Sequence, residues 1–161
     1  MVPARKSAEE LVRTLRTIGQ TVATAESCTG GLTASHIVSV PGASEVFQNG
    51  FITYCDEAKI RILQVDPDTL RTETAVSART AAQMAVGCAR VGQADLALSV
   101  TGLAGPGGET PGRPVGLVYI GCFYRGRTLV QEYHLRGDRD EIRSQAAAFA
   151  LQLGYYCLRA R

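Results

Sequence analysis

The chain has 161 residues, of which 45% are hydrophobic and 20% charged, and its formal net charge is +2. This length and composition suit one domain with a substantial core, and so small a charge, without a basic stripe interleaved with aromatic residues, argues against a nucleic-acid partner. The charged residues near the N-terminus exclude a signal peptide, and no apolar run approaches the roughly 18 residues of a membrane span.

Cysteine and histidine usage favours a protein with free thiols and no metal. The five cysteines are odd in number and show no Cys-x-x-Cys spacing, so we expect a reduced, cytoplasmic protein. The two histidines, His36 and His134, belong to no cluster with metal-ligand spacing. We therefore predict neither a metal nor any other cofactor.

Hydrophobic periodicity and turn residues divide the chain into alternating helices and strands. A capping box at Ser7 and Glu10 is expected to open a first helix, which Gly19 ends. The later predictions are a strand at 21–25, a helix at 29–38, a strand at 47–54, a helix at 56–63, a turn at 66–68, a helix at 77–91 with Ser77 as N-cap, a strand at 96–100, a hairpin of 115–123 and 128–135, and a last helix after Gly137-Asp138. This order predicts an α/β fold, a three-layer α/β/α domain over residues 1–161, with a mixed, mostly parallel sheet that ends in an antiparallel hairpin.

Ser27 stands in a turn of small residues between an apolar strand and a helix. Such a turn exposes its first side chain and aims backbone N–H groups at whatever that side chain attacks. Ser27 is therefore a candidate nucleophile, and the N–H groups around Thr29, Gly30 and Gly31 are candidate oxyanion donors. Two alternatives stay open here: Ser27 as a simple N-cap, and the adjacent Cys28 as the nucleophile.

Lys59 is the second candidate residue. Only Lys6 and Lys59 are lysines among the 17 basic residues, and a lysine shielded from water, unlike an arginine, can lose its proton and act as a base. Tyr54 precedes Lys59 by five positions at the end of a predicted strand. Because the carboxyl ends of parallel strands share one edge of a sheet, Tyr54 and Lys59 can both face Ser27.

Four motifs give this pattern a family resemblance: TAESCTGG (24–31), GFITYCDEAK (50–59), TGLAGPGG followed by RPVG (101–108 and 113–116), and GDRDEIRSQAAAFAL (137–151). Together they resemble the C-terminal domain of the CinA family, which includes standalone nicotinamide-nucleotide amidases. The resemblance implies hydrolysis of the carboxamide of nicotinamide mononucleotide to the carboxylate, with release of ammonia, by a free-standing amidase module. The family's serine, tyrosine and lysine fall on Ser27, Tyr54 and Lys59. Gly107, where aspartate is frequent, and Cys55-Asp56, where Ser-Asn is common, depart from the pattern.

The resemblance also sets expectations for binding and mechanism. A neutral Lys59 would take the Ser27 proton directly or through Tyr54. Candidate ligands for the substrate phosphate are the loop residues Thr101, Gly102 and Gly105 together with Arg139.

Partners are predicted on the same basis. The expected partner is a small molecule, a pyridine mononucleotide, with no nucleic acid and no membrane, and self-association into a homo-oligomer is expected. Three alternatives remain: a catalytically weak nucleotide-binding or partner-interaction module, a thiol amidase using Cys28, and a pairing of Ser27 with His134.

Overall fold

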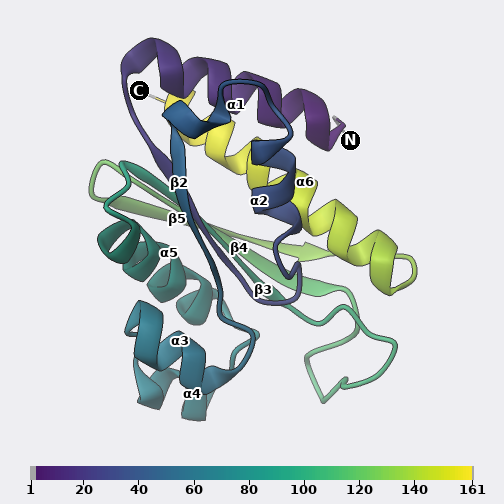
Figure 1. The fold of residues 1–161 in the computed structure, drawn as a ribbon. Helices are drawn as coiled ribbons and strands as arrows, with labels where there is room; N and C mark the ends of the chain where they lie inside the picture. The colour runs from purple at the N-terminus through teal and green to yellow at the C-terminus, as the bar shows by residue number, and fades with distance from the viewer. Residues whose placement is uncertain (1–2, 161) are drawn as a thin grey trace.

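The computed structural model of the protein describes residues 3–160 as one mixed β-sheet with helices on both faces (Figure 1). The elements, in chain order, are α1 (Ala4–Ile18), β1 (Val22–Glu26), α2 (Leu32–Val38), a short 3₁₀ turn η1 (Ala43–Glu45), β2 (Phe47–Ile52), α3 (Asp56–Leu63), α4 (Pro67–Glu73), α5 (Ala78–Gly92), β3 (Leu96–Gly102), β4 (Leu117–Tyr124), β5 (Arg127–His134) and α6 (Arg139–Arg159). Among these helices none is both long and apolar enough to cross a bilayer.

The strand order is β2-β1-β3-β4-β5. Strand β1 runs parallel to β2 and to β3, whereas β4 is antiparallel to β3 and forms a hairpin with β5. The predicted α/β fold, with a mixed sheet that ends in an antiparallel hairpin, is confirmed. Because β1, β2 and β3 point the same way, the segments that follow them meet at one edge of the sheet.

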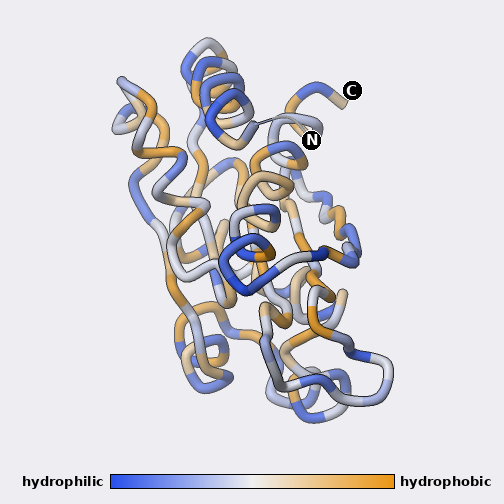
Figure 2. The backbone as a smooth tube through the Cα atoms, turned by 90° about the vertical axis from the view of Figure 1, so that its right-hand side faces the viewer, coloured by the Kyte–Doolittle hydropathy of each residue, from blue (hydrophilic) through white to orange (hydrophobic). Residues whose placement is uncertain are grey.

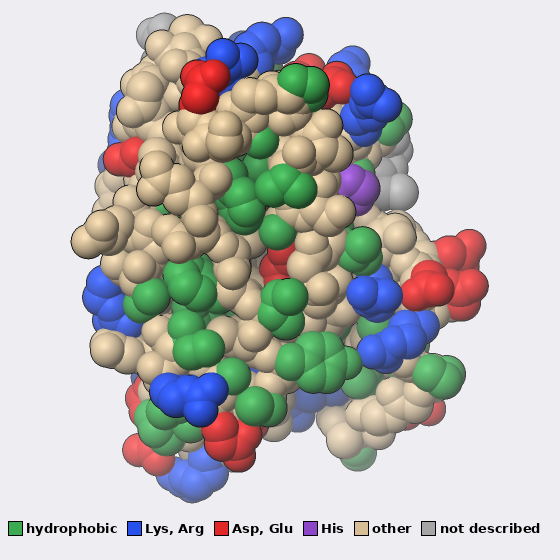
Figure 3. All heavy atoms as spheres, in the orientation of Figure 1, with side chains coloured by type: hydrophobic (Ala, Val, Ile, Leu, Met, Phe, Trp, Pro, Cys, Tyr) green, Lys and Arg blue, Asp and Glu red, His purple; other side chains and the backbone are tan. Residues whose placement is uncertain are grey.

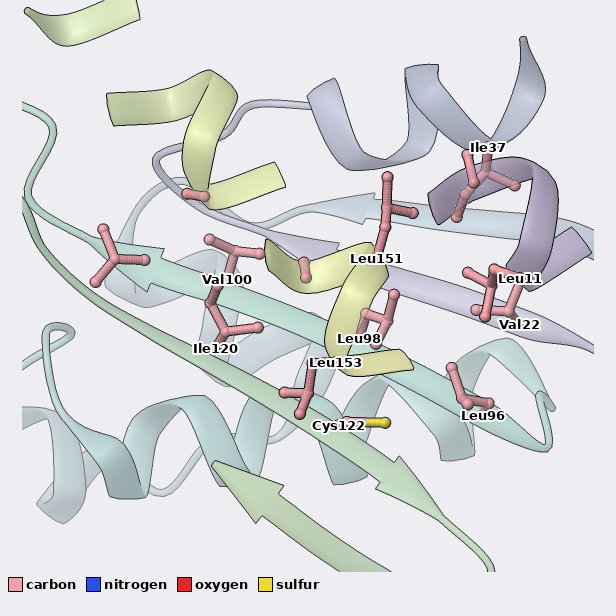
Figure 4. Close-up of a cluster of buried hydrophobic side chains, with 14 of the residues drawn as sticks. Leu11, Val22, Ile37, Leu96, Leu98, Val100, Ile120, Cys122, Leu151 and Leu153 are labelled. Carbon is pink, nitrogen blue, oxygen red and sulfur yellow. The ribbon is translucent and has the colours of Figure 1, made fainter. Parts of the chain in front are cut away.

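Two hydrophobic cores hold the helices on the sheet. Helices α1, α2 and α6 cover one face and α3, α4 and α5 the other (Figure 1). On the first face, Leu98 and Ile120 of the sheet lie in one cluster with Leu151 of α6 (Figure 4); on the second, Met84 and Cys88 of α5 pack on the sheet. Along the helices, apolar and polar residues alternate (Figure 2), as expected for helices with one buried side. Burial of each large apolar side chain contributes about 1.5–3 kcal/mol, so these faces fix the layers.

The start of α6 is fixed by a capping box. The side chain of Asp138 accepts a hydrogen bond from the N–H of Glu141 at 2.9 Å, and the Glu141 carboxylate accepts one from the N–H of Asp138 at 2.8 Å. This reciprocal pair satisfies two N–H groups that a helix start would otherwise leave unpaired. The first turns of α6, which carry Arg139 and Arg143, are thereby held in one orientation.

Helix starts were the least accurate sequence predictions. The capping box at Ser7 is wrong, because α1 starts at Ala4 and Ser7 is buried inside it, with its N–H donating to the Pro3 carbonyl. The expected turn at 66–68 is the start of α4, where Asp66 is the N-cap and Pro67 the first helical residue. Proline suits that position because its missing N–H would have no helical partner there.

Two boundaries near the parallel edge also differ from the prediction. Helix α2 begins at Leu32 rather than at 29, because Gly30 and Gly31 take positive φ angles of 59° and 101° that a helix does not allow. Strand β3 continues through Thr101 and Gly102, which were predicted to be loop, because they pair with Tyr119 and Val118 of β4.

Candidate active site

Ser27 lies immediately after β1, at the edge where the parallel strands end. Its N–H donates to the Val100 carbonyl on β3 at 2.9 Å, and its own carbonyl accepts the N–H of Gly30 at 3.0 Å. The backbone on both sides of the residue is therefore held by hydrogen bonds. The residue is 8% exposed, and its side chain lines a cavity rather than the open surface.

Lys59 meets Ser27 from the next parallel segment. It lies in the first turns of α3, is only 1% exposed, and its Nζ atom is 3.2 Å from Ser27 Oγ. Nζ also contacts two backbone carbonyls, that of Thr53 at 2.9 Å and that of Tyr54 at 3.4 Å. Burial lowers the pKa of the Lys59 amine below its ordinary value of 10.5, and attraction to Asp56 only partly opposes that shift.

Tyr54 lies at the rim of the cavity, away from the contact between Ser27 and Lys59. Its ring is 60% exposed, and its hydroxyl accepts a hydrogen bond from Arg139 Nη2 at 3.0 Å. Arg139 Nη1 donates to the Gly105 carbonyl at 2.6 Å, which ties α6 to the loop after β3. Within residues 3–160 the Tyr54 hydroxyl makes no hydrogen bond to Ser27 or Lys59. The structure therefore brings Lys59, and not the Tyr54 phenol, to the serine.

A cavity of about 240 Å³ opens in front of these groups. The sequence-predicted residues that line it are Ser27, Tyr54, Lys59, Thr101, Gly102, Gly105 and Arg139. Thr101 is held by its hydroxyl, which donates to the Ala75 carbonyl at 2.7 Å. At Gly102 a Cβ atom would lie 2.7 Å from the Leu117 carbonyl oxygen, so a residue without a side chain is needed there. Gly102 therefore allows the close pairing of β3 with β4 beside the cavity.

The predicted oxyanion donors do not line this cavity. The N–H of Gly30 is bonded to the Ser27 carbonyl, and the N–H of Gly31 donates to a carboxylate oxygen of Glu26 at 3.0 Å. In contrast, the N–H groups of Cys28 and Thr29 have no hydrogen-bond acceptor in the described part of the chain. Of these, Cys28 follows the serine directly and lines the cavity.

Two supporting residues escaped the sequence analysis, and the first is Glu26. It is 1% exposed, and its carboxylate accepts hydrogen bonds from the N–H groups of Gly31, Thr33 and Ala34 at 2.9–3.0 Å. A carboxylate is favoured at the positive end of a helix. Glu26 therefore caps α2 and fixes the turn that contains Ser27.

The second is Arg143, whose guanidinium clamps the same turn from α6. Its Nε atom donates to the Cys28 carbonyl at 3.0 Å and its Nη2 atom to the Thr29 carbonyl at 3.1 Å, while Asp140 pairs with Nη1. Arg143 lies one helical turn after Arg139, and this i, i+4 spacing could have indicated a shared face. Helix α6 thus holds both the turn after β1 and the loop after β3.

The structure disfavours two alternative catalytic residues, Cys28 as the nucleophile and His134 as the partner of Ser27. Burial raises the pKa of the Cys28 thiol to about 11, which keeps it protonated and poorly nucleophilic. His134 lies exposed on the edge strand β5, with its ring nitrogen 2.7 Å from Glu132, and β4 separates it from β3. Within residues 3–160, no three His, Cys, Asp or Glu side chains gather as a possible metal site.

The fold and the cavity define a mixed α/β domain with a buried lysine against a serine hydroxyl at the carboxyl edge of its parallel strands. Residues 4–158 match the family model of the CinA C-terminal domain, and the chain belongs to this family. It is 52% identical over 147 residues to a CinA-like protein of Kosmotoga olearia, covering 91% of this chain and 36% of that protein. A putative competence-damage inducible protein of Clostridium novyi is 50% identical over 82% of this chain and 32% of its own length. The chain thus spans about a third of these two relatives.

Solved structures agree over almost the whole domain. The competence/damage inducible protein CihA of Agrobacterium tumefaciens superposes with a TM-score of 0.94 at 39% identity, covering 98% of this chain and 96% of that one. The competence damage-inducible protein A of Klebsiella pneumoniae also gives a TM-score of 0.94, at 32% identity over 99% of both chains. The names of these relatives state no reaction.

Proposed function

We propose that this domain hydrolyses the carboxamide of nicotinamide mononucleotide to the carboxylate and releases ammonia, with Ser27 as nucleophile and Lys59 as general base. The observation that carries the proposal is the 3.2 Å contact between the buried Lys59 amine and the Ser27 hydroxyl. The sequence motifs that resemble those of the nicotinamide-nucleotide amidases indicate the substrate class. The contact between Lys59 and Ser27 indicates a serine nucleophile activated by a lysine base.

The surroundings of Lys59 suit an uncharged amine. A neutral amine has two hydrogens and one lone pair, and its contacts are two carbonyl oxygens, of Thr53 and Tyr54, and one hydroxyl. In the uncharged form that we propose, the two hydrogens go to the carbonyls and the lone pair faces the Ser27 hydroxyl. Lys59 can then remove the serine proton as the oxygen attacks.

Attack of Ser27 Oγ on the amide carbon gives a tetrahedral intermediate with a negatively charged oxygen. The N–H of Cys28, the residue that follows Ser27 and lines the cavity, is the donor we assign to this oxygen, and one such donor is worth about 3–4 kcal/mol in other hydrolases. The protonated Lys59 then returns its proton to the nitrogen, and ammonia leaves. Water, deprotonated by Lys59, cleaves the serine ester and releases the carboxylate.

The rim of the cavity fits the rest of a pyridine mononucleotide. The exposed Tyr54 ring can stack against a cationic pyridinium, an interaction favoured by the charge distribution of an aromatic face. Arg139 offers a planar guanidinium to the phosphate, and the loop from Thr101 to Gly107 adds backbone N–H groups. In this proposal Tyr54 orients the ring and does not relay the proton.

The test is ammonia release by the purified protein without added metal, comparing the mononucleotide, its riboside and free nicotinamide. We expect release from the mononucleotide, weaker release from the other two, and none from Ser27→Ala with an unchanged melting temperature. Ammonia release that survives Ser27→Ala would exclude the mechanism.

One observation favours a second candidate, a nucleotide-binding module without turnover. Gly107 lines the cavity at the position where the family pattern frequently has aspartate, and a Cβ atom there would meet nothing within 4 Å. The site therefore lacks a carboxylate that it has room for. Calorimetry that shows tight binding of the mononucleotide, with no ammonia formed over hours, would support this candidate over the amidase.

A further inference from the structure

The sheet ends on one side in β5, whose outer edge has no neighbouring strand within residues 3–160. All 8 residues of β5 pair with β4 without a shift in register. The turn between them has positive φ angles at Arg125 and Gly126, and a two-residue turn of this kind closes on a hydrogen-bonded pair. Because hydrogen-bonded pairs alternate along an antiparallel ladder, every second residue of β5 directs its backbone N–H and C=O groups outward. These residues are Thr128, Val130, Glu132 and His134.

One face of β5 is only partly covered by the rest of the domain. Helix α6 packs on β3 and β4, and an apolar groove lies between α6 and β5. The groove holds a cavity of about 380 Å³, and a second of about 530 Å³ adjoins it, because Leu129 and Tyr156 line both. Leu129 is 39% exposed and Tyr156 is 60% exposed. An edge strand with open backbone groups thus lies beside exposed apolar side chains.

We propose that β5 and this groove form the interface between two copies of the chain, whose sheets join by antiparallel pairing of β5 with its own counterpart. A two-fold axis through Gln131 places Thr128 opposite His134 of the second copy. The same axis places Val130 opposite Glu132 of the second copy. All four outward-facing residues of each strand then exchange backbone hydrogen bonds, as in the isologous interface of a two-fold dimer. An axis through Val130 would instead place His134 opposite the turn, where it has no partner.

This register also matches apolar side chains across the interface. Leu129 and Tyr133 both line the groove, so they lie on the same face of the sheet. With the axis at Gln131, Leu129 of each copy lies opposite Tyr133 of the other, and opposite side chains on one face of a sheet are in contact. The Tyr133 ring is already stacked on that of Phe149, with the ring centroids 4.5 Å apart. Pairing therefore removes from water the apolar surface that a single chain leaves exposed.

Charge complementarity favours a second copy as the occupant of this edge. The register places the β4–β5 turn of one copy beside residues 136–138 of the other, where α6 begins. Arg125 and Arg127 are exposed at that turn. In the facing segment, three exposed acidic residues outnumber two arginines: Asp138, Asp140 and Glu141 against Arg136 and Arg139. Because the axis is two-fold, this attraction acts at both ends of the paired strands.

The opposite edge of the sheet is less suited to pairing with another strand. The register of β2 with β1 shifts between Val22 and Ala23, which interrupts a regular ladder. The cavity beside Ser27 lies where the parallel strands end, and β4 separates β5 from those strands. The proposed interface therefore does not depend on the proposed amidase activity.

The first test is the mass of the full chain in solution, measured by analytical ultracentrifugation over micromolar concentrations. We expect twice the mass of one chain. Leu129→Lys brings a charge to the apolar groove and should weaken the dimer by about tenfold or more. The matched control is Val38→Lys, at a residue on α2 that is 60% exposed, and it should dimerise as the wild type does. A monomeric wild type, or equal dimerisation of the two variants, would overturn the proposal.

Disulfide trapping tests the register without disturbing the groove. Only the residue on the axis faces its own counterpart, and in such a non-hydrogen-bonded pair the Cα atoms are about 4.5 Å apart, within reach of a disulfide. In a Cys55→Ser background, which removes an exposed thiol, Gln131→Cys should form a disulfide-linked dimer with oxidised glutathione. Thr128→Cys, far from its own counterpart, should not. Absence of the link in Gln131→Cys, or equal linkage in Thr128→Cys, would contradict the proposed pairing.

Discussion

The Nζ atom of Lys59 and the Oγ atom of Ser27 lie 3.2 Å apart, although 32 positions of sequence separate the two residues. The parallel pairing of β1 with β2 creates this contact, because it places the start of α3 beside the turn after β1. Lys59 is only 1% exposed, and within residues 3–160 its amine has the serine hydroxyl and two carbonyls as hydrogen-bond partners.

The first prediction concerns pH. The uncharged form of Lys59 increases as pH rises, and burial lowers the pKa of this amine, so kcat/KM should rise with pH and level off below 10.5. In that window the unfolded chain binds a proton at Lys59 that the folded chain has lost, so Lys59 contributes a free energy of unfolding that rises with pH, whereas buried thiols such as Cys28, whose pKa is raised, contribute in the opposite direction. Rate profiles and denaturant titrations at several pH values measure both effects. The free energy of unfolding should therefore rise more steeply with pH in the wild type than in Lys59→Met, and equal slopes in the two proteins would contradict the assignment.

The second prediction concerns Arg143 as a positioning residue. Arg143→Met removes the two hydrogen bonds to the Cys28 and Thr29 carbonyls, which hold the turn after Ser27. A displacement of about 1 Å in such a turn costs on the order of 10²-fold in rate, so kcat should fall by that amount while KM changes little. The matched control is Arg71→Met, which breaks only an exposed ion pair with Asp68. Equal kinetics for the two variants would show that the clamp has no role in the reaction.

The third prediction concerns the buried carboxylate. In Glu26→Gln an NH₂ group replaces one of the two oxygens that accept the N–H groups of Gly31, Thr33 and Ala34. A buried N–H without an acceptor costs about 1–3 kcal/mol, so the free energy of unfolding should fall by this amount. Denaturant unfolding measures it, with Glu9→Gln, in an exposed ion pair on α1, as the control. A loss no larger than that of Glu9→Gln would mean that Glu26 does not hold the turn.

The fold was largely predictable because its long apolar segments carry clear periodicity. The buried run at Leu96–Val100 and the hairpin around Arg125-Gly126 both appear where their sequence patterns place them. Turns and helix starts were harder to predict, because the same residues are typical of both. Asp66-Pro67 suits both a turn and a helix start, and only the packing of α4 beside α5 decides between them.

For the site, residue types were predictable and hydrogen-bond partners were not. The scarcity of lysine singled out Lys59, and strand order brought it to Ser27. No local pattern reveals that Glu26 accepts a hydrogen bond from the N–H of Gly31, or that Arg139 donates one to the Tyr54 hydroxyl. Both contacts depend on how the elements pack. Basic and acidic side chains are interspersed on the face shown in Figure 3. The expected lack of nucleic-acid and membrane partners and the expected self-association stay predictions.

The most direct test of the account is ammonia release from nicotinamide mononucleotide by Lys59→Met, measured beside the wild type and Lys59→Arg. Methionine fills the same space without a base, and arginine keeps its proton, so both variants should lose on the order of 10³-fold or more in kcat. Circular dichroism should show the fold retained in Lys59→Met. Wild-type rates in that folded variant would contradict the claim that the buried amine activates the serine.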